Sequence, residues 1–178
     1  MPEILIQPAV VDDVPQLLTL ERYYQTGYVW QIFRSDDENQ VGVAFRQVRL
    51  PREVKVEYPR SLAQIEREWA QNMHLSAVLL GEAVGYIGVR EDGDSRMAWV
   101  TDLVVAESVR RQGIATALLL AAQDWAVGRG LRGMVTVAQS KNYPAIRLAL
   151  KLGYEFSGYH DHYYANQEIA LFFARNLR

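Results

Sequence analysis

Residues 75–106 are largely apolar in long runs, and the spacing of apolar residues becomes helical after residue 113. In the first region, three apolar runs are broken at residues 81–82 and by the turn-forming stretch 91–95, which predicts an antiparallel meander of three strands. The pattern beyond it is typical of an α/β segment. It predicts helices over 113–127 and 143–152 and strands over 132–138, near 154–159 and near 167–175.

The first 75 residues contribute further elements. Residues 4–10 predict a short strand, and residues 11–24 predict a helix with Asp12 or Asp13 at its first turn. Residues 28–50 predict two strands around a polar turn, because their apolar positions nearly alternate on either side of it. Residues 61–73 predict a helix that Ser61 caps. Its apolar side chains recur at helical intervals: Leu62, Ile65, Trp69 and Met73.

Length and composition indicate one globular domain. A chain of 178 residues can bury a sizeable core, so we expect a single domain over residues 1–178. Hydrophobic residues make up 49% of the chain, charged residues make up 22%, and the formal net charge is -2. No overall basic field therefore points to a nucleic-acid partner, and any anion binding must be local.

Several kinds of site have no support in the sequence. The absence of cysteine excludes disulfides, thiolate metal sites and cysteine nucleophiles. His74, His160 and His162 are too few and too scattered to predict a metal site. No apolar run approaches the roughly 20 residues that span a bilayer, and residues 1–10 lack the features of a signal peptide. We therefore expect a cytoplasmic protein with no metal, no membrane partner and no nucleic-acid partner.

Residues 107–116 place two arginines and one glycine before a helix rich in alanine and leucine. The helix dipole disfavours positive charge at this end. However, a strand that passes through a glycine turn into a helix exposes unpaired N–H groups, and these form an anion site. Gly113 and Ala115 are small enough for an anion to approach the backbone closely, and Arg110 and Arg111 can neutralise the charge of a polyphosphate. The segment is neither a P-loop, since no Gly-Lys-Ser/Thr follows, nor the dinucleotide fingerprint, which needs three glycines.

The sequence from Arg110 to Ala115 resembles the pyrophosphate loop of the GNAT superfamily of acyl-CoA-dependent N-acetyltransferases. That loop reads Arg or Gln, two residues, Gly, one residue, and Gly or Ala. Residues 102–119 match the family's strand, loop and helix together, and residues 141–159 match its later strand, helix and strand. The resemblance implies an α/β (α+β) fold with a mixed, mostly antiparallel central sheet, helices on both faces and a splayed pair of parallel strands. Without the second match, the loop would be better explained as a turn with solvated charges.

The resemblance further implies that acetyl-CoA is the cofactor and lies in the gap between the splayed strands. Residues of about 96–158 would form the acetyl-CoA-binding core, and residues of about 20–75 would form the acceptor side. The pantetheine arm would pair with the backbone of the first strand, the loop would hold the pyrophosphate, and Asn142 would both cap its helix and contact the cofactor. The expected cofactor-binding residues are Leu103, Val104, Val105, Arg110, Arg111, Gln112, Gly113, Ile114, Ala115, Thr116 and Asn142.

Residues 29–59 and 163–173 are also similar to the streptothricin acetyltransferase branch of this family. Three positions depart from the family or branch pattern. Ala149 stands where the family often has a tyrosine that protonates the departing thiolate, and Thr101 and about Val137 stand where the branch tends to carry acidic residues. The loss of these acids counts against streptothricin itself as the substrate.

Two side chains are candidates for proton transfer. Asp102 interrupts an apolar strand beside the cofactor and is the first candidate base, directly or through water; a structural, hydrogen-bonded carboxylate is the alternative. Tyr164 is the candidate acid in place of Ala149, because it matches the closing tyrosine of the branch. The alternative for Tyr164 is a ring that covers the core. A backbone N–H near Val105 is the candidate oxyanion donor.

The acceptor side is expected to use aromatic rings and a carboxylate, namely Tyr24, Tyr28, Trp30 and Glu57. Such a set suits a cationic amine, although core rings and a solvated acid explain the same residues. The predicted function is acetyl transfer from acetyl-CoA to a primary amine of a small cationic molecule, such as an antibiotic or a polyamine, by direct attack in a ternary complex. The alternatives are acetylation of protein N-termini or lysines and a catalytically weak acyl-CoA sensor. The resemblance leaves a homodimer open.

Overall fold

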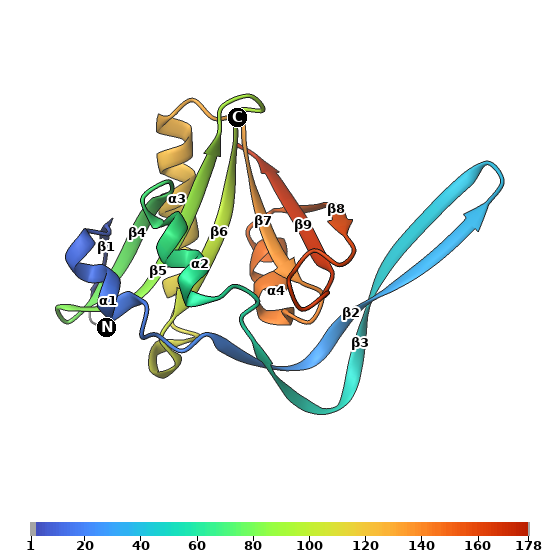
Figure 1. The fold of residues 1–178 in the computed structure, drawn as a ribbon, viewed down its shortest axis with the longest axis horizontal. Helices are drawn as coiled ribbons and strands as arrows, with labels where there is room; N and C mark the ends of the chain where they lie inside the picture. The colour runs from blue at the N-terminus through green and yellow to red at the C-terminus, as the bar shows by residue number, and fades with distance from the viewer. Residues whose placement is uncertain (1–2, 178) are drawn as a thin grey trace.

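The computed structural model describes residues 3–177, which form one seven-stranded sheet and a separate hairpin (Figure 1). The order of strands across the sheet is β1-β4-β5-β6-β7-β9-β8. Only β6 and β7 run parallel, and every other neighbouring pair is antiparallel. This confirms the expected mixed, mostly antiparallel sheet. The strands are β1 (Ile4–Pro8), β4 (Met73–Leu79), β5 (Glu82–Asp92), β6 (Met97–Val105), β7 (Gly133–Gln139), β8 (Glu155–His160) and β9 (Ala170–Asn176).

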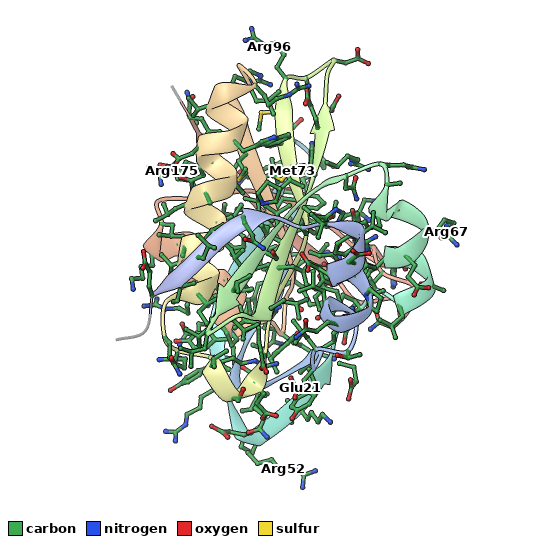
Figure 2. The ribbon with its side chains drawn as sticks, turned by 90° about the vertical axis from the view of Figure 1, so that its left-hand side faces the viewer. Glu21, Arg52, Arg67, Met73, Arg96 and Arg175 are labelled. Carbon is green, nitrogen blue, oxygen red and sulfur yellow. The ribbon has the colours of Figure 1, made fainter. Side chains whose placement is uncertain are left out.

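Helices cover both faces of the sheet, as Figure 2 shows for α3 on one side and for α1 and α2 on the other. α3 (Ile114–Gly128) and α4 (Tyr143–Lys151) close the larger core, in which Ile87, Leu118 and Ile146 are almost fully buried. α1 (Val14–Leu17) and α2 (Leu62–Trp69) lie over a smaller core around Leu17 and Tyr86. Burial of apolar area on two faces accounts for the near-continuous apolar runs of the central strands.

The hairpin is formed by β2 (Tyr23–Asp37) and β3 (Gln40–Glu57) and extends far beyond the sheet as an arm (Figure 1). Its base is attached to the domain. The Trp30 N–H donates to the Ser140 carbonyl at 2.9 Å, and the Phe45 ring lies 5.5 Å from the Phe156 ring on β8. The turn and alternating strands expected from residues 28–50 are thus confirmed, and the strands are longer than expected.

The structure changes the prediction at one helix. The predicted helix over 11–24 is wrong in its length, because only a 3-10 turn (Val11–Asp13) and α1 are helical. Tyr23 and Tyr24 instead pair with Glu57 and Val56 at the base of the arm, so tertiary pairing overrides the helical pattern. Ser61 does cap α2, since its Oγ accepts from the Gln64 N–H at 3.2 Å. None of the helices in the described part of the chain is both long and apolar enough to span a membrane.

Candidate active site

The parallel strands β6 and β7 separate at the centre of the sheet. They pair from Met97–Gly133 to Val100–Thr136, and β6 then continues to Val105 and β7 to Gln139 without pairing to each other. The expected splayed pair is therefore present. The gap between the two strands opens toward their carboxyl ends, on the side where α3 begins.

A β-bulge at Thr101 separates the two strands. Gly88 of β5 pairs with Asp102 and Val89 pairs with Val100, so Thr101 is the extra residue. A bulge bends its strand and moves the side chains that follow it to the other face. Val100 accordingly belongs to the core under α3, whereas Val104 belongs to the core under α1 and α2. Gly88 makes room for the bulge, since a Cβ there would lie 2.7 Å from Thr101 Oγ1.

The end of β6 turns backbone groups into the gap. The Ala106 N–H donates to the Val84 carbonyl on β5 at 2.8 Å. Because N–H and C=O groups alternate sides along a strand, those of Leu103 and Val105 point away from β5, toward the gap. An extended amide-containing chain can therefore pair with both backbone groups of Leu103 and with the Val105 N–H, whereas the Val105 carbonyl already accepts from Arg110 Nε.

The loop after β6 forms an open cradle at the start of α3. Arg111 and Gly113 have φ values of 67° and 85°, and Gly113 is the N-cap of α3. A helix leaves its first N–H groups without intrahelical acceptors, and glycine has no side chain to cap them. A Cβ added to Gly113 would meet no atom within 4 Å. Backbone donors that point into open space beside a left-handed turn fit the pyrophosphate of coenzyme A.

The two arginines of this loop have different surroundings. Arg110 Nε donates to the Val105 carbonyl at 3.0 Å, and its Nη2 donates to the Glu21 carbonyl at the same distance. The Arg110 guanidinium therefore connects the end of β6 to the segment before the arm. Arg111 is exposed and forms no ion pair within residues 3–177, which leaves it as the cation for a bound phosphate. Ile114 is 1% exposed, so only its backbone can face a ligand.

Asn142 lies at the far side of the gap. Its Oδ1 accepts from the Ala145 N–H at 3.1 Å, which confirms the expected cap of α4. The same residue also lines the cavity described next. Ala149, in the same helix, is 2% exposed and belongs to the larger core. A tyrosine at position 149 would need space that the core does not have.

A cavity of about 260 Å³ lies where β6 and β7 separate. Its walls come from the segment before α2 and α2 itself, from β5, β6 and β7, and from the loop between β8 and β9. Its lining residues are Tyr58, Pro59, Arg60, Gln64, Glu68, Arg90, Trp99, Val100, Thr101, Val137, Ala138, Gln139, Asn142, Tyr163, Tyr164 and Ala165. The cavity adjoins the gap through Val100, Thr101 and Asn142. It is therefore the candidate acceptor site.

Asp102 lies behind this cavity in a buried ion pair. Its Oδ2 accepts from Arg60 Nη1 at 2.7 Å, and its Oδ1 accepts from the Tyr58 hydroxyl at 2.9 Å. Arg60 also pairs with Glu68 of α2. Burial raises the pKa of Asp102 above its ordinary value, and the Arg60 guanidinium opposes that rise. Both carboxylate oxygens of Asp102 accept hydrogen bonds. The donors, Tyr58 and Arg60, line the cavity, so they lie between the cavity and Asp102.

Tyr164 lines the cavity from the β8–β9 loop. Burial raises the pKa of Tyr164, and nearby Tyr163 and Glu168 raise it further, so its hydroxyl is protonated at neutral pH. Glu168 fixes the loop, because it pairs with Lys141 at 2.7 Å and accepts a hydrogen bond from Gln139. The hydroxyl therefore carries a proton and is held at the cavity, but the raised pKa makes Tyr164 a weaker acid than an ordinary tyrosine.

The predicted acceptor residues lie around the cavity but do not line it. The Tyr24 hydroxyl donates to Gln139 Oε1 at 2.7 Å, and the Tyr28 ring lies 4.9 Å from the Tyr143 ring. Trp30 packs against the larger core. Glu57 is not brought to the cavity, since its side chain is 75% exposed and pairs only with Lys55 at 3.6 Å. Tyr24, Tyr28 and Trp30 therefore hold the base of the arm and the cavity wall in position.

Sequence reasoning missed several residues that do line the cavity. Four of them lie around the predicted pair Asp102 and Tyr164, and no sequence motif identifies them: Tyr58, Arg60, Glu68 and Gln139. One signal was present, because a carboxylate in an apolar strand requires a buried cationic or hydrogen-bonding partner. That rule predicts a partner for Asp102 without naming Arg60. Among residues 3–177, no three His, Asp or Glu side chains cluster in a way that would hold a metal ion.

Comparison with known proteins adds a family and a set of similar folds. Residues 29–154 match the model of the acetyltransferase (GNAT) family. A search of curated proteins finds no match. A nourseothricin acetyltransferase has a similar structure, with a TM-score of 0.85, 21% identity and coverage of 98% of this chain and 99% of that one.

Two other solved structures have the same fold. A Bacillus anthracis str. Ames protein assigned as a streptothricin acetyltransferase, solved with acetyl coenzyme A, has a TM-score of 0.76 and 16% identity over 98% of this chain and 99% of its own. The Escherichia coli ribosomal-protein-S18-alanine N-acetyltransferase has a TM-score of 0.68 and 17% identity over 98% and 94% of the two chains. At these identities the likeness shows the fold.

Proposed function

The chain belongs to the acetyltransferase (GNAT) family, and we propose that it acetylates a primary amine on a small cationic molecule. Members of this family are acyl-CoA-dependent N-acetyltransferases, and acetyl-CoA is their cofactor. The proposal concerns the acceptor and the residues that act on it. The observation that carries it is the cavity of about 260 Å³ at the separation of β6 and β7, at the opposite end of the gap from the cradle at the start of α3.

The proposed cofactor residues follow the geometry of the gap. The N–H groups at the start of α3, from Gly113 to Thr116, hold the pyrophosphate together with Gln112 and the free Arg111. Leu103 and Val105 pair with the pantetheine arm, and Val104, between them, points its side chain into the smaller core. Arg110 keeps the loop in place, and Asn142 contacts the arm from the opposite strand. Bound acetyl-CoA supplies an acyl group that its thioester has already activated.

The proposed chemistry needs three functions from the protein. The Val105 N–H, the expected oxyanion donor, pairs with the pantetheine arm in this arrangement; the Leu103 N–H faces the same gap closer to Thr101 and the cavity, and it can donate to the carbonyl oxygen as negative charge develops there. Asp102 accepts the proton of the acceptor amine through the Tyr58 hydroxyl or a water molecule, because Tyr58 connects the cavity to Asp102 Oδ1. Tyr164 donates its hydroxyl proton to the departing sulfur. Since the thioester is already reactive, positioning of the amine contributes much of the rate.

Size supports a small acceptor. The cavity is smaller than most drug-sized pockets, which have volumes of about 300–1,000 Å³. Among the described residues, Glu68 is the one carboxylate that lines the cavity, but it pairs with Arg60, and Arg90 lines the same cavity, so the charge of the lining alone does not select a cation. The proposal of a cationic amine is supported by the similar structures, which include a nourseothricin acetyltransferase and a protein assigned as a streptothricin acetyltransferase. Thr101 and Val137 at the branch's acidic positions favour a different amine.

We expect Tyr164→Phe to lower kcat by about 10²-fold, because the substitution removes the proton donor and leaves the ring in place. The KM for acetyl-CoA should change little, since the pyrophosphate cradle lies on another element. Tyr163→Phe is the matched control, because Tyr163 lines the same cavity but is 46% exposed. Steady-state kinetics, followed by the release of the free thiol of coenzyme A, give kcat and KM for both variants. Equal effects of the two substitutions would remove Tyr164 from the proposed mechanism.

The acceptor is tested with a panel of amines under saturating acetyl-CoA. The panel contains polyamines, aminoglycoside-like compounds, peptides with free N-termini and lysine peptides with blocked N-termini. Turnover of the small cations supports the proposal. Turnover of the peptides alone would replace it with protein acetylation, and acetyl-CoA binding without any turnover would indicate a sensor.

A further inference from the structure

Arg90 brings a positive charge to the acceptor cavity. It lies near the end of β5, is exposed, and forms no ion pair within the described part of the chain. Glu91, the next residue, pairs with Arg129 at 3.0 Å. Asp92 Oδ2 accepts from Ser95 Oγ at 2.7 Å, and this bond, more than the charge of Arg90, lowers the pKa of Asp92. The Arg90 guanidinium is therefore available to a molecule in the cavity.

The other charged groups at the cavity form one cluster. Arg60 Nη1 lies 2.7 Å from Asp102 Oδ2, and Arg60 Nη2 pairs with Glu68. One guanidinium thus contacts two carboxylates, so the cluster of Arg60, Asp102 and Glu68 has a formal charge of one negative unit. Arg90 supplies one positive unit. The two charges cancel in sum, but they are separated in space, and this separation can orient a molecule that carries both signs.

Arg90 and Asp102 lie on the same face of the sheet. Side chains alternate along a strand, so Arg90 shares a face with Tyr86, which belongs to the smaller core under α1 and α2. Gly88, between them on that face, pairs with Asp102, and Arg90 pairs with Trp99. Two residues along a strand correspond to about 7 Å. The positive group therefore lies about two strand positions from the negative cluster, along one wall of the cavity.

We propose that the acceptor carries a carboxylate that Arg90 binds, and that the acetylated amine is the one farther from that carboxylate. This inference rests on the proposed acetylation of a small cationic amine and narrows it to diamino acids, which remain cations because they have two amines and one carboxylate. A guanidinium binds a carboxylate through two parallel hydrogen bonds, which fix its orientation. A phosphate fits less well, because it carries nearly two negative charges and Arg90 offers one positive charge.

The orientation follows from the separation of the charges. With the carboxylate at Arg90, the α-amine of an amino acid stays beside that carboxylate, because only one carbon atom lies between them. A side-chain amine several bonds away can span about 7 Å and reach Tyr58 and the negative cluster. We therefore expect the side-chain amine to be acetylated.

Two pairs of compounds test this inference under saturating acetyl-CoA: lysine with cadaverine, and ornithine with putrescine. The members of each pair differ only in the carboxylate. The wild type should have a higher kcat/KM for the amino acid than for the diamine in at least one pair. Nuclear magnetic resonance of the product should place the acetyl group on the side-chain amine.

Arg90→Gln should lower the ratio of kcat/KM for the amino acid to kcat/KM for its diamine by about 10-fold, because a hydrogen bond between charged groups is lost. Arg90→Lys keeps the charge and should recover part of that ratio. Arg67→Gln is the matched control. Arg67 belongs to α2, is exposed, is not among the residues that line the cavity, and points away from the ribbon in Figure 2. Its loss should leave the ratio at the wild-type value.

Three results would overturn the inference. Equal losses for amino acid and diamine in Arg90→Gln would give Arg90 a structural role without carboxylate binding. A wild type that does not favour the amino acid in either pair has no carboxylate site. Acetylation of the α-amine reverses the orientation. The proposed function fails separately, since it is wrong only if no small amine is turned over; turnover of diamines without a preference for the amino acids removes the carboxylate site and leaves the proposed function in place.

Discussion

Gly113→Asp is expected to abolish the stabilisation of the protein by acetyl-CoA. At a concentration 100 times its Kd, a ligand that binds only the folded state adds about 2.7 kcal/mol to the free energy of unfolding. For a chain of this length that corresponds to a rise in Tm of roughly 5–10 °C. In the variant, a carboxylate fills the open space at the start of α3 and repels the pyrophosphate, so the rise should disappear.

The backbone effect of this substitution has a matched control. Gly113 and Gly81 both have φ of 85°, and a Cβ added to either meets no atom within 4 Å. Gly81→Asp therefore introduces the same left-handed strain of about 1–3 kcal/mol, but in the turn between β4 and β5, away from the cradle. Differential scanning fluorimetry with and without acetyl-CoA compares the two. Loss of the rise in both variants, or no rise in the wild type, would refute the cradle.

Local sequence signals predicted the elements that hold the cofactor. The three apolar runs of residues 75–106 and the turns that break them predicted β4, β5 and β6, and the glycine turn before an alanine- and leucine-rich run predicted the start of α3. Ser61 and Asn142 were predicted as helix caps, and both accept the expected backbone hydrogen bond. Each of these features depends on residues close together in the chain. A single sequence states such short-range rules directly.

The acceptor cavity depends on contacts that the sequence does not mark. Strand alternation places Ala98, Val100 and Asp102 on one face of β6, but the bulge at Thr101 moves Asp102 to the opposite face. There it meets Arg60, 42 positions earlier in the chain. A bulge is defined by the pairing of two strands, and one strand's pattern does not contain it. Contacts between distant segments also decide which carboxylate lines the cavity. For this reason the sequence predicted Glu57 for the site and missed Glu68.

The buried pair of Arg60 and Asp102 leads to the second large prediction. Their side chains are 14% and 1% exposed, and the Nη1 to Oδ2 distance is 2.7 Å. Arg60→Met removes the guanidinium and leaves a buried carboxylate without its ion-pair partner, although the Tyr58 hydroxyl still donates to it. Removing one partner of a buried pair costs about 3–5 kcal/mol. We expect a loss of that size in the free energy of unfolding at pH 8, measured with urea.

The loss should become smaller at acid pH. Burial already raises the pKa of Asp102, and removal of Arg60, which opposes that rise, raises it further. A carboxyl whose pKa is higher in the folded state than in the unfolded state contributes stability below its unfolded value, and that contribution is lost as the pH rises through the folded value. Arg60→Met should therefore be closer to the wild type at pH 5 than at pH 8.

Two further variants separate this explanation from a general loss of packing. Arg129→Met breaks an exposed pair with Glu91 at 3.0 Å, where side chains are 57% and 32% exposed, and should cost less than about 1 kcal/mol. Arg60→Met combined with Asp102→Asn removes the buried charge and should recover part of the loss. If Arg60→Met costs no more than Arg129→Met, or if its cost is the same at both pH values, Arg60 does not hold the charge of Asp102. The route from the cavity to Asp102 would then have to be found elsewhere, because in the proposed mechanism the ionised carboxylate that accepts the amine proton depends on that guanidinium.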